Sequence, residues 1–211
     1  QLSKAFPEWS VAKIMNKVGI AARRVVAKDE FTSDLAVAAA QNLFNEDNLN
    51  PADIDYLILC TQSPDYFLPA TACVVHERLQ LSSTAGAIDI NQGCSGFVYG
   101  IGLAKGLIAA GDVSNVLLIT AETYSRFLHP EDKGNRSIFG DAAAAVLISA
   151  NPAGGKIDKV VLGTDGKGAK NLIVRNGAMR FPKTADQSMQ EDKEGNIFND
   201  NYLYMNGTEI F

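Results

Sequence analysis

The chain has 211 residues, of which 46% are hydrophobic and 20% charged, and its formal net charge is −5. This length allows a substantial hydrophobic core, and the composition is typical of a globular protein. The acidic balance, without any basic block, argues against nucleic acid as the main partner. No apolar run approaches the length of a membrane span, and no signal peptide is recognisable.

Cysteine and histidine are scarce. The three cysteines, at 60, 73 and 94, are an odd number without paired spacing, which favours reduced thiols in a cytoplasmic protein. The two histidines lie far apart and no Cys-x-x-Cys occurs, so we expect no metal site. The glycines at 100, 102 and 106 do not fit the dinucleotide fingerprint, and no Walker loop is present. We therefore expect no bound cofactor.

The predicted elements alternate between helices and short apolar strands. The first half has a short helix within 1–16, a helix over 34–45 capped by Thr32 or Ser33, a strand over 56–60, a loop over 61–69, a helix over 70–79 and a strand over 86–90. The second half has a helix ending at 110, strands over 116–120, 142–149, 156–164 and 202–205, a polar loop over 122–139, and loops with short hairpin strands over 166–201.

This alternation predicts an α/β fold with a mostly parallel or mixed sheet, covered by helices on both faces. We find no internal repeat and no flexible linker. The simplest prediction is a single domain over residues 1–211.

One stretch combines a strand, a turn and an unusual helix. The strand over 86–90 ends in a polar turn, which opens into a helix that is apolar on nearly every side. Such a helix is expected to be buried. Its glycines would destabilise an exposed helix, so we expect other backbones to pass close to it. Cys94 lies at the predicted first turn.

A helix N-terminus favours an anion, and a thiolate is an anion. Cys94 is therefore a candidate nucleophile, and Gly93 and Gly96 leave room for a substrate to approach its sulfur. A buried structural cysteine explains the same local pattern. Neither His76 nor His129 is an evident partner for the thiol, because one lies inside a predicted helix and the other in a charged loop.

The segment 89–100, Asp-Ile-Asn-Gln-Gly-Cys-Ser-Gly-Phe-Val-Tyr-Gly, resembles the active-site cysteine motif of β-ketoacyl-acyl carrier protein synthase III, in the thiolase-like superfamily. Further blocks resemble that family in the same order: Leu-Pro-Ala-Thr-Ala at 68–72, Asp-Lys-Gly at 132–134, Ser-Ile-Phe-Gly-Asp-Ala at 137–142 and Asn-Gly-Thr-Glu-Ile-Phe at 206–211. The resemblance spans nearly the whole chain and favours Cys94 as the nucleophile.

The resemblance implies a thiolase-like fold of two similar halves, each with a mixed five-stranded sheet, stacked in αβαβα layers. This chain corresponds to the N-terminal half. The first strand is then expected before Gln1. The catalytic histidine and asparagine, and the glycine amide that completes the oxyanion hole, are expected in the second half. We therefore expect this fragment alone to be inactive.

The implied activity is that of an acyltransferase of fatty acid biosynthesis. Cys94 takes an acyl group from acyl-coenzyme A, and malonyl-acyl carrier protein then decarboxylates and attacks the resulting thioester. The implied partners are acyl-coenzyme A, acyl carrier protein and a second copy of the chain. In that homodimer the strand over 86–90 pairs with its two-fold mate, because a bare edge is an aggregation liability.

The sequence departs from the family where coenzyme A is expected to bind. Lys13 replaces the tryptophan of the motif W-I-x-x-R-T-G-I, and Lys17 replaces its arginine. Trp9 lies four residues too early to take over the stack without a shifted helix. Lys133 stands for arginine in the Asp-Arg-Gly block. We assign these four residues to coenzyme A binding, with weak affinity because an ammonium cannot stack on a base.

The resemblance places Leu68 and Phe139 at the acyl-substrate pocket. Leu68 stands where the family carries a bulky gate to the partner's pocket, and a leucine could admit longer chains. We therefore expect carrier-bound or longer acyl donors to be preferred.

Two alternative functions remain open. The segment Thr-Gln-Ser-Pro at 61–64 faintly resembles the T-E-S-P loop of hydroxymethylglutaryl-coenzyme A synthase, but Gln62 replaces the acid. A non-catalytic subunit of a heteromeric synthase is the second alternative. Such subunits usually lose the cysteine, and Cys94 is retained.

Overall fold

The computed structural model describes residues 2–8, 10–151, 153–185, 188–191 and 195–210. The chain folds as two compact units, which we call the sheet unit and the second unit. The sheet unit comprises Val26–Thr123 and Asp141–Leu162, and the second unit comprises Gln1–Val25, Tyr124–Gly140 and Gly163–Phe211. The single domain expected over 1–211 stays a prediction.

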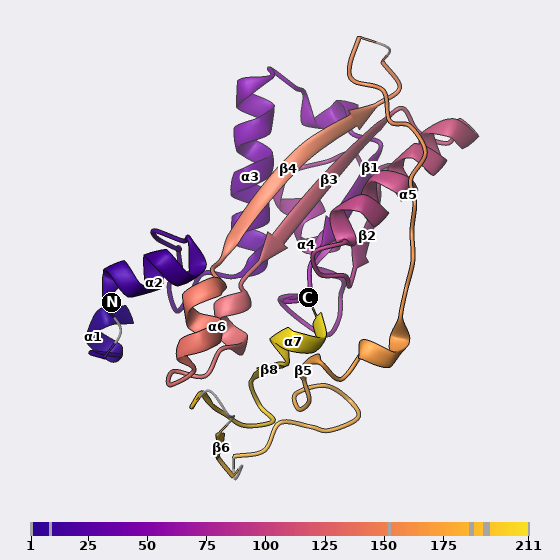
Figure 1. Ribbon diagram of the computed structural model, residues 1–211. Coiled ribbons are helices and arrows are strands. Elements are labelled where there is room, and N and C mark those ends of the chain that lie inside the picture. Colours follow the sequence, from indigo (N-terminus) through magenta and orange to yellow (C-terminus); the bar gives the residue numbers. More distant parts are fainter. Residues whose placement is uncertain (1, 9, 152, 186–187, 192–194, 211) are drawn as a thin grey trace. The chain divides into compact units, whose positions relative to one another are not determined.

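A mixed four-stranded sheet forms the centre of the sheet unit (Figure 1). Its strands, in spatial order, are β2 (Gly86–Ile90), β1 (Tyr56–Cys60), β3 (Asn115–Glu122) and β4 (Ala142–Ser149). The first three are parallel, and β4 runs antiparallel to β3. The predicted mixed sheet is confirmed, with four strands in the described residues where the resemblance implies five. All four strands lie where the sequence predicts them, because short apolar runs between turn residues are a strong signal.

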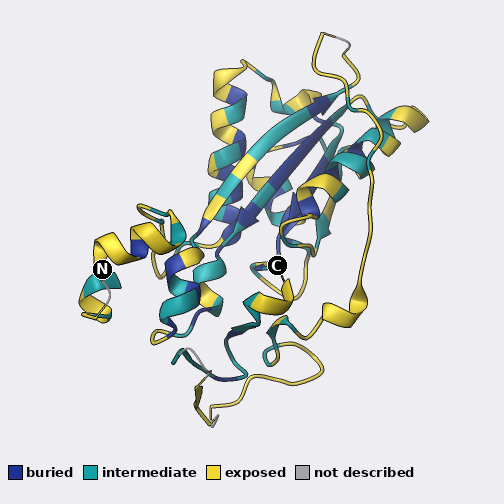
Figure 2. Ribbon diagram, viewed as in Figure 1, coloured by how far each residue is buried: buried dark blue, intermediate teal, exposed yellow. Residues whose placement is uncertain are grey.

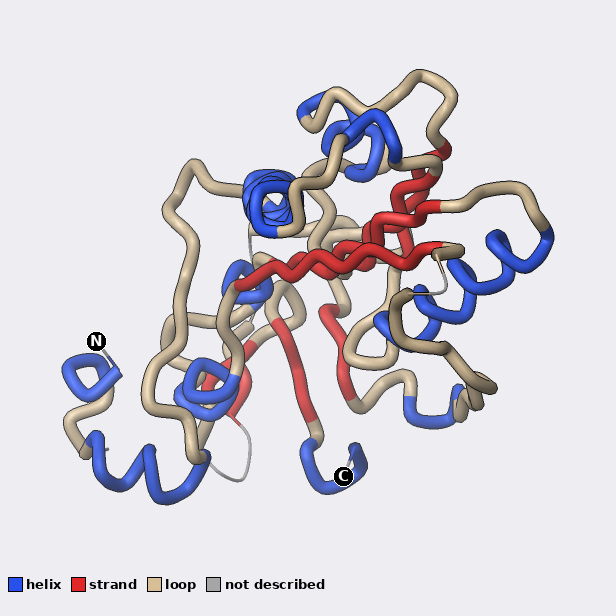
Figure 3. The backbone as a smooth tube through the Cα atoms, turned by 90° about the horizontal axis from the view of Figure 1, so that it is seen from above, coloured by secondary structure: helices blue, strands red, loops and turns tan. Residues whose placement is uncertain are grey.

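Helices cover both faces of this sheet (Figure 3). The helices α3 (Thr32–Glu46) and α4 (Thr71–Arg78) pack on one face, and α5 (Gly96–Ala110) packs on the other. Side chains alternate between the faces along a strand. Leu57 of β1 therefore joins the core under α3 and α4, whereas Ile58 joins the core under α5. The strands β1 and β3 are buried along most of their length (Figure 2).

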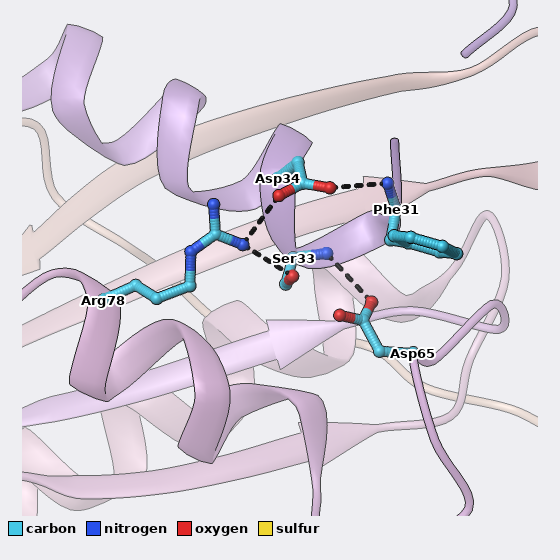
Figure 4. Close-up of polar contacts among 5 residues, drawn as sticks. All are labelled: Phe31, Ser33, Asp34, Asp65 and Arg78. Atoms are coloured by element: carbon cyan, nitrogen blue, oxygen red, sulfur yellow. Dashed lines mark hydrogen bonds and ion pairs between the residues drawn. The ribbon is translucent and has the colours of Figure 1, made fainter. Parts of the chain in front are cut away.

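The start of α3 is tied to α4 and to the loop after β1 (Figure 4). The Asp34 carboxylate accepts a hydrogen bond from the Phe31 amide at 2.7 Å and pairs with Arg78 of α4 at 2.8 Å. Arg78 also donates to the Ser33 hydroxyl at 2.8 Å, and the Ser33 amide donates to Asp65 at 3.0 Å. The helix begins earlier than predicted, so the residues expected to cap it form its first turn.

The helix α5 packs on the sheet through a single stripe. Its buried residues are Gly96, Gly100 and Ala104, and Ile101 and Ile108 also pack on the core. The apolar side chains Phe97, Val98 and Leu103 are 40%, 42% and 49% exposed. The expectation of a helix buried on every side is therefore wrong for the described residues. Other backbones were also expected to pass close to its glycines, and this is wrong. Side chains of the strands lie there instead: Leu118 occupies the space beside Gly100.

In its described residues, the second unit contains only short elements. Its helices are α1 (Leu2–Ala5), α2 (Val11–Val18), α6 (Lys133–Ile138) and α7 (Gly207–Ile210). Its strand pairs are β5 (Leu172–Val174) with β8 (Leu203–Met205), and β6 (Gln190–Glu191) with β7 (Ile197–Phe198). The predicted hairpin strands are thus confirmed. Single-turn 3₁₀ helices lie at Tyr124–Phe127 and Gly166–Gly168 of this unit, and at Pro51–Asp53 of the sheet unit.

Two sequence predictions fail in the connecting segments. The polar loop expected over 122–139 contains α6, which begins because the Asp132 carboxylate accepts a hydrogen bond from the Asn135 amide at 2.9 Å. The strand expected over 156–164 is absent, although all of these residues are described. Val161 and Leu162 remain 79% and 50% exposed. Among the described helices, none combines the length and hydropathy that a membrane span requires.

Candidate active site

Cys94 lies in the turn over 91–95 that joins β2 to α5, and its side chain is exposed. The helix begins at Gly96 with Ser95 as its N-cap. Cys94 is therefore one residue ahead of the N-cap, and the prediction that it lies in the first helical turn is wrong by a few residues. It still directly precedes the N-terminal, positive end of a fifteen-residue helix.

Two side chains at the end of β1 support this turn. The Cys60 thiol donates to the Gln92 carbonyl at 3.3 Å, and its Sγ fills the space that a Cβ on residue 96 would occupy. The Oε1 atom of Gln62 lies 3.0 Å from the position of a Cβ on residue 93. Gly93 and Gly96 therefore make room for Gln62 and Cys60, where the sequence suggested room for a substrate.

Glu122, at the end of β3, holds the segment that carries Gln62. One carboxylate oxygen accepts from the Gln62 amide at 2.7 Å, and the other accepts from the Ser63 hydroxyl at 2.6 Å. The Ser63 hydroxyl in turn accepts from the Thr123 amide at 2.9 Å. The Thr32 hydroxyl donates to the Ser63 carbonyl at 2.5 Å. Sequence reasoning missed this cluster, because its members come from three separate segments.

Burial shapes the electrostatics of this cluster. Desolvation raises the pKa of Glu122, with hydrogen bonds from Ser63 and Gln62 opposing the rise and the Asp141 charge adding to it. Desolvation also raises the pKa of the Cys60 thiol, and the charge of Glu122 adds to that effect. Cys60 therefore stays protonated at neutral pH and is a poor nucleophile. The exposed thiols are those at 73 and 94.

Asp89 anchors the other side of the Cys94 turn. Its two carboxylate oxygens accept hydrogen bonds from the Thr71 and Ala72 amides, each at 2.7 Å. These amides belong to the first residues of α4, so the carboxylate caps that helix. The loop before α4 carries Leu68, which is 82% exposed. Leu68 and Cys94 both belong to the sheet unit.

The residues assigned to coenzyme A belong to the second unit. Lys13 and Lys17 are exposed on α2, four residues apart and hence on the same side of the helix. The Lys133 ammonium lies 3.6 Å from the Glu8 carboxylate. Trp9 lies outside the described residues. 

Phe139, the other residue assigned to the acyl pocket, also belongs to the second unit. Its ring lies 4.9 Å from that of Tyr124, and its carbonyl accepts from the Arg23 guanidinium at 3.1 Å.

Both histidines have local partners. His76 Nε2 lies 3.0 Å from the Ser82 carbonyl, to which it donates. His129 Nδ1 accepts from the Glu131 amide at 3.2 Å, and its ring meets that of Tyr202 edge-on at 4.8 Å. These contacts agree with structural roles for both residues.

Comparison with known proteins shows which family the chain resembles. Residues 88–166, which include Cys94, match the family described as 3-oxoacyl-[acyl-carrier-protein (ACP)] synthase III. A β-ketoacyl-[acyl-carrier-protein] synthase III of Clostridium perfringens is 38% identical over 206 residues, which are 98% of this chain and 60% of that protein. One from Deinococcus deserti is 36% identical over 204 residues, 97% of this chain and 55% of that protein. The chain is similar to β-ketoacyl-acyl carrier protein synthase III proteins over nearly its whole length.

Solved structures of this family share the fold. A 3-oxoacyl-(acyl-carrier-protein) synthase III crystal structure matches with a TM-score of 0.94 and 47% identity, over 99% of this chain and 63% of that chain. A β-ketoacyl-acyl carrier protein synthase III from Thermus thermophilus matches with a TM-score of 0.75 and 32% identity, over 98% of this chain and 60% of that chain. The predicted α/β, thiolase-like half is thereby confirmed.

The chain spans 60% and 55% of the length of the two curated relatives above. These relatives favour the synthase III family over the two alternatives, a hydroxymethylglutaryl-coenzyme A synthase and a non-catalytic partner subunit.

Proposed function

We propose that Cys94 is the acylated nucleophile of a β-ketoacyl-acyl carrier protein synthase III acting in fatty acid biosynthesis. The observation that carries the proposal is the exposed Cys94 thiol directly before α5, within the residues that match the family. The helix N-terminus stabilises a thiolate, which is both a good nucleophile and a good leaving group. The Cys60 thiol also lies against Gly96, but it is buried and donates to the Gln92 carbonyl.

The reaction has two stages. The Cys94 thiolate attacks the carbonyl carbon of an acyl thioester, and the thiolate of coenzyme A leaves as the Cys94 thioester forms. Malonyl-acyl carrier protein then loses carbon dioxide, and its carbanion attacks the Cys94 thioester. The carbon–sulfur bond breaks, which returns the Cys94 thiolate and releases the β-ketoacyl product. The backbone amide of Cys94 donates to the developing oxyanion.

The family resemblance assigns decarboxylation to a histidine and an asparagine in the second half, and no residue of this chain substitutes for them. The local contacts of His76 and His129 agree with that division. Residues 1–211 alone are accordingly inactive in condensation, because catalytic groups of this kind act as a unit.

The acyl donor binds through the second unit in this proposal. Lys13 and Lys17 present two exposed ammonium groups on one side of α2, which suits the phosphates of coenzyme A. The helix α2 also borders a cavity of about 420 Å³ in that unit. Lys133 contributes less, because Glu8 already neutralises it. Carrier-bound or longer acyl donors are preferred, with Leu68 as the gate residue.

The protein is a cytoplasmic homodimer in this proposal. Support comes from β2, which lies at the edge of the sheet and carries the 42%-exposed Ile88. A second copy paired on that edge would satisfy its open hydrogen-bonding groups. No resident cofactor takes part, since coenzyme A enters as the substrate thioester.

The test is a condensation assay with the intact protein, an acyl-coenzyme A and malonyl-acyl carrier protein. We expect a β-ketoacyl-acyl carrier protein product, which Cys94→Ala abolishes and Cys73→Ala leaves unchanged. Product formation by Cys94→Ala at the rate of the unaltered protein would contradict the proposal.

A further inference from the structure

Glu122 takes no part in the chemistry above, yet each of its carboxylate oxygens has a donor on the segment after β1. The Gln62 amide donates to Oε1 and the Ser63 hydroxyl donates to Oε2. Both donors are neutral. A partly buried carboxylate with two such bonds and a raised pKa is costly to keep ionised.

The segment that Glu122 holds, residues 62–63, lies against the Cys94 turn. Gln62, whose backbone Glu122 holds, places its side-chain amide against Gly93. Cys60, two residues earlier, donates its thiol hydrogen to the Gln92 carbonyl. The residues 92 and 93 immediately precede Cys94. Contacts thus run without interruption from Glu122, through Gln62, to the turn that carries the nucleophile.

The loop has a second fixed point. The Asp65 carboxylate accepts from the Ser33 amide at the start of α3 (Figure 4). The amide of Asp65 donates to the Thr71 hydroxyl at 3.0 Å. The part of the loop beyond Ser63 is therefore attached to α3 and α4. The part next to Cys94 is attached to Glu122 through Gln62 and Ser63, and Thr32 and Thr123 add hydrogen bonds to Ser63.

We propose that Glu122 is a positioning residue for Cys94, which fixes the Gln62–Ser63 backbone on which the Cys94 turn rests. This inference rests on the proposed function, because the position of Cys94 matters for catalysis only if Cys94 is the nucleophile. Glu122 acts through Gln62 and Ser63 and touches no reacting atom.

The role needs a carboxylate. An ionised carboxylate offers acceptors to both donors, whereas a glutamine of the same shape offers one carbonyl and turns an NH₂ group toward the other donor. Glu122→Gln therefore breaks one contact at nearly constant volume. Among the described residues, the titratable groups that face Glu122 are the Cys60 thiol of β1 and the Asp141 carboxylate beside β4.

Asp55 offers a matched control at the opposite end of the same strands. Its carboxylate accepts from the Ser114 amide at 2.8 Å and from the Asn115 amide at 2.9 Å. Asp55→Asn removes a carboxylate charge before β1 and β3, as Glu122→Gln removes one at the end of β3. It removes no contact to the Cys94 turn. Any effect of losing a carboxylate charge at one end of these strands appears in both variants.

The experiment measures alkylation of Cys94 by iodoacetamide in the intact protein, from about pH 6 to about pH 9, with peptide mass spectrometry to separate the cysteines. We expect Glu122→Gln to lower the Cys94 rate constant roughly tenfold at the alkaline end. The unaltered protein should stay the faster of the two over the whole range. Asp55→Asn should follow the unaltered protein at every pH.

Equal alkylation of Glu122→Gln and the unaltered protein across this range would overturn the inference, as would equal losses in Glu122→Gln and Asp55→Asn. If Glu122→Gln does not fold, Gln62→Ala tests the same contact path, with a slower reaction expected and an unchanged one contradictory. Iodoacetamide needs no acyl donor. Failure of the proposed function, seen as no acylation of Cys94 by acyl-coenzyme A, is thus distinguishable from failure of this inference.

Discussion

The sulfur of Cys60 occupies the space that a side chain on Gly96 would need. This contact joins the end of β1 to the first residue of α5, two residues after Cys94. The thiol of Cys60 also bonds the Gln92 carbonyl, so it contacts the Cys94 turn on both sides. Glycine at 96 is thus required by the strand beneath it.

Gly96→Ala should overpack this contact. We expect the free energy of unfolding to fall by about 1–3 kcal/mol, because Cys60 or the turn must shift. Alkylation of Cys94 should slow as well. Gly106→Ala is the control within the same helix, since no described atom lies within 4 Å of a Cβ at 106. It should stabilise the protein by about 1 kcal/mol or less. Urea unfolding of both variants checks this, and equal effects would contradict the packing argument.

The raised pKa of Glu122 predicts how stability depends on pH. Between the unfolded pKa of about 4.3 and the higher folded pKa, the native protein binds more protons than the unfolded chain. The contribution of Glu122 is therefore complete below the unfolded pKa and is lost as pH rises through the folded pKa. In Glu122→Gln the side chain does not ionise, so this pH-dependent decrease in the free energy of unfolding is absent.

The measurement is urea unfolding over a pH series. The free energy of unfolding of the unaltered protein, relative to Glu122→Gln, should decrease as pH rises through this window. Glu77→Gln, at an exposed position of α4, is the control and should show no such trend. A relative stability that increases with pH would show that the fold favours the ionised carboxylate.

The basic pair on α2 predicts how coenzyme A thioesters bind. The double variant Lys13→Gln, Lys17→Gln should raise KM for acyl-coenzyme A several-fold, and more at low salt, because surface charges are screened by ions. Lys159→Gln, also exposed, is the control. Steady-state kinetics of the intact protein at two salt concentrations test this. A KM unaffected by the double variant would remove these lysines from the donor site.

Donor choice is a separate prediction. Acetyl- and octanoyl-coenzyme A and the matching carrier-bound donors should be compared, with carrier-bound or longer donors expected to react faster. If Trp9 takes over the missing stack, acetyl-coenzyme A will instead bind tightly and be preferred, and Trp9→Ala will abolish that preference. That result would contradict the specialised donor specificity.

The edge strand β2 predicts a homodimer. Sedimentation of the intact protein should give twice the monomer mass, and the β2 amides that point away from β1 should be protected from hydrogen exchange. Dilution that dissociates the dimer should expose them. A stable monomer with freely exchanging β2 amides would exclude pairing through this edge.

The sheet was predictable from the sequence, whereas several of its surroundings were not. The strands Tyr56–Cys60 and Gly86–Ile90 are short apolar runs between turn residues, and their burial depends little on distant partners. The strand expected over 156–164 has the same apolar character but no partner strand in the described residues. Hydropathy along the chain does not reveal whether a partner exists.

The helix α6 and the exposed sides of α5 were missed for a related reason. The segment Lys133–Ile138 contains glycine and asparagine and has weak periodicity, so its helix depends on the Asp132 cap, which is a short-range signal that is easily missed. For α5 the apolar pattern is real, but only one stripe faces the sheet. A pattern records which side chains are apolar, and packing decides which of them are covered.

The site was predictable at its centre only. Cys94 was singled out as a candidate by the turn and helix around it and by the family resemblance, whereas Glu122 and Gln62 were not recognised as its support. They meet because β1 and β3 are neighbours in the sheet, although sixty residues separate them in the sequence. Such relationships follow from strand order, which periodicity does not encode.

The central claim, acylation of Cys94, is tested most directly by incubating the intact protein with an acyl-coenzyme A and mapping the adduct by peptide mass spectrometry. We predict a single acyl adduct on Cys94, absent from Cys94→Ala and retained in Cys73→Ala. An adduct on Cys60 or Cys73, or one that persists in Cys94→Ala, would contradict the account.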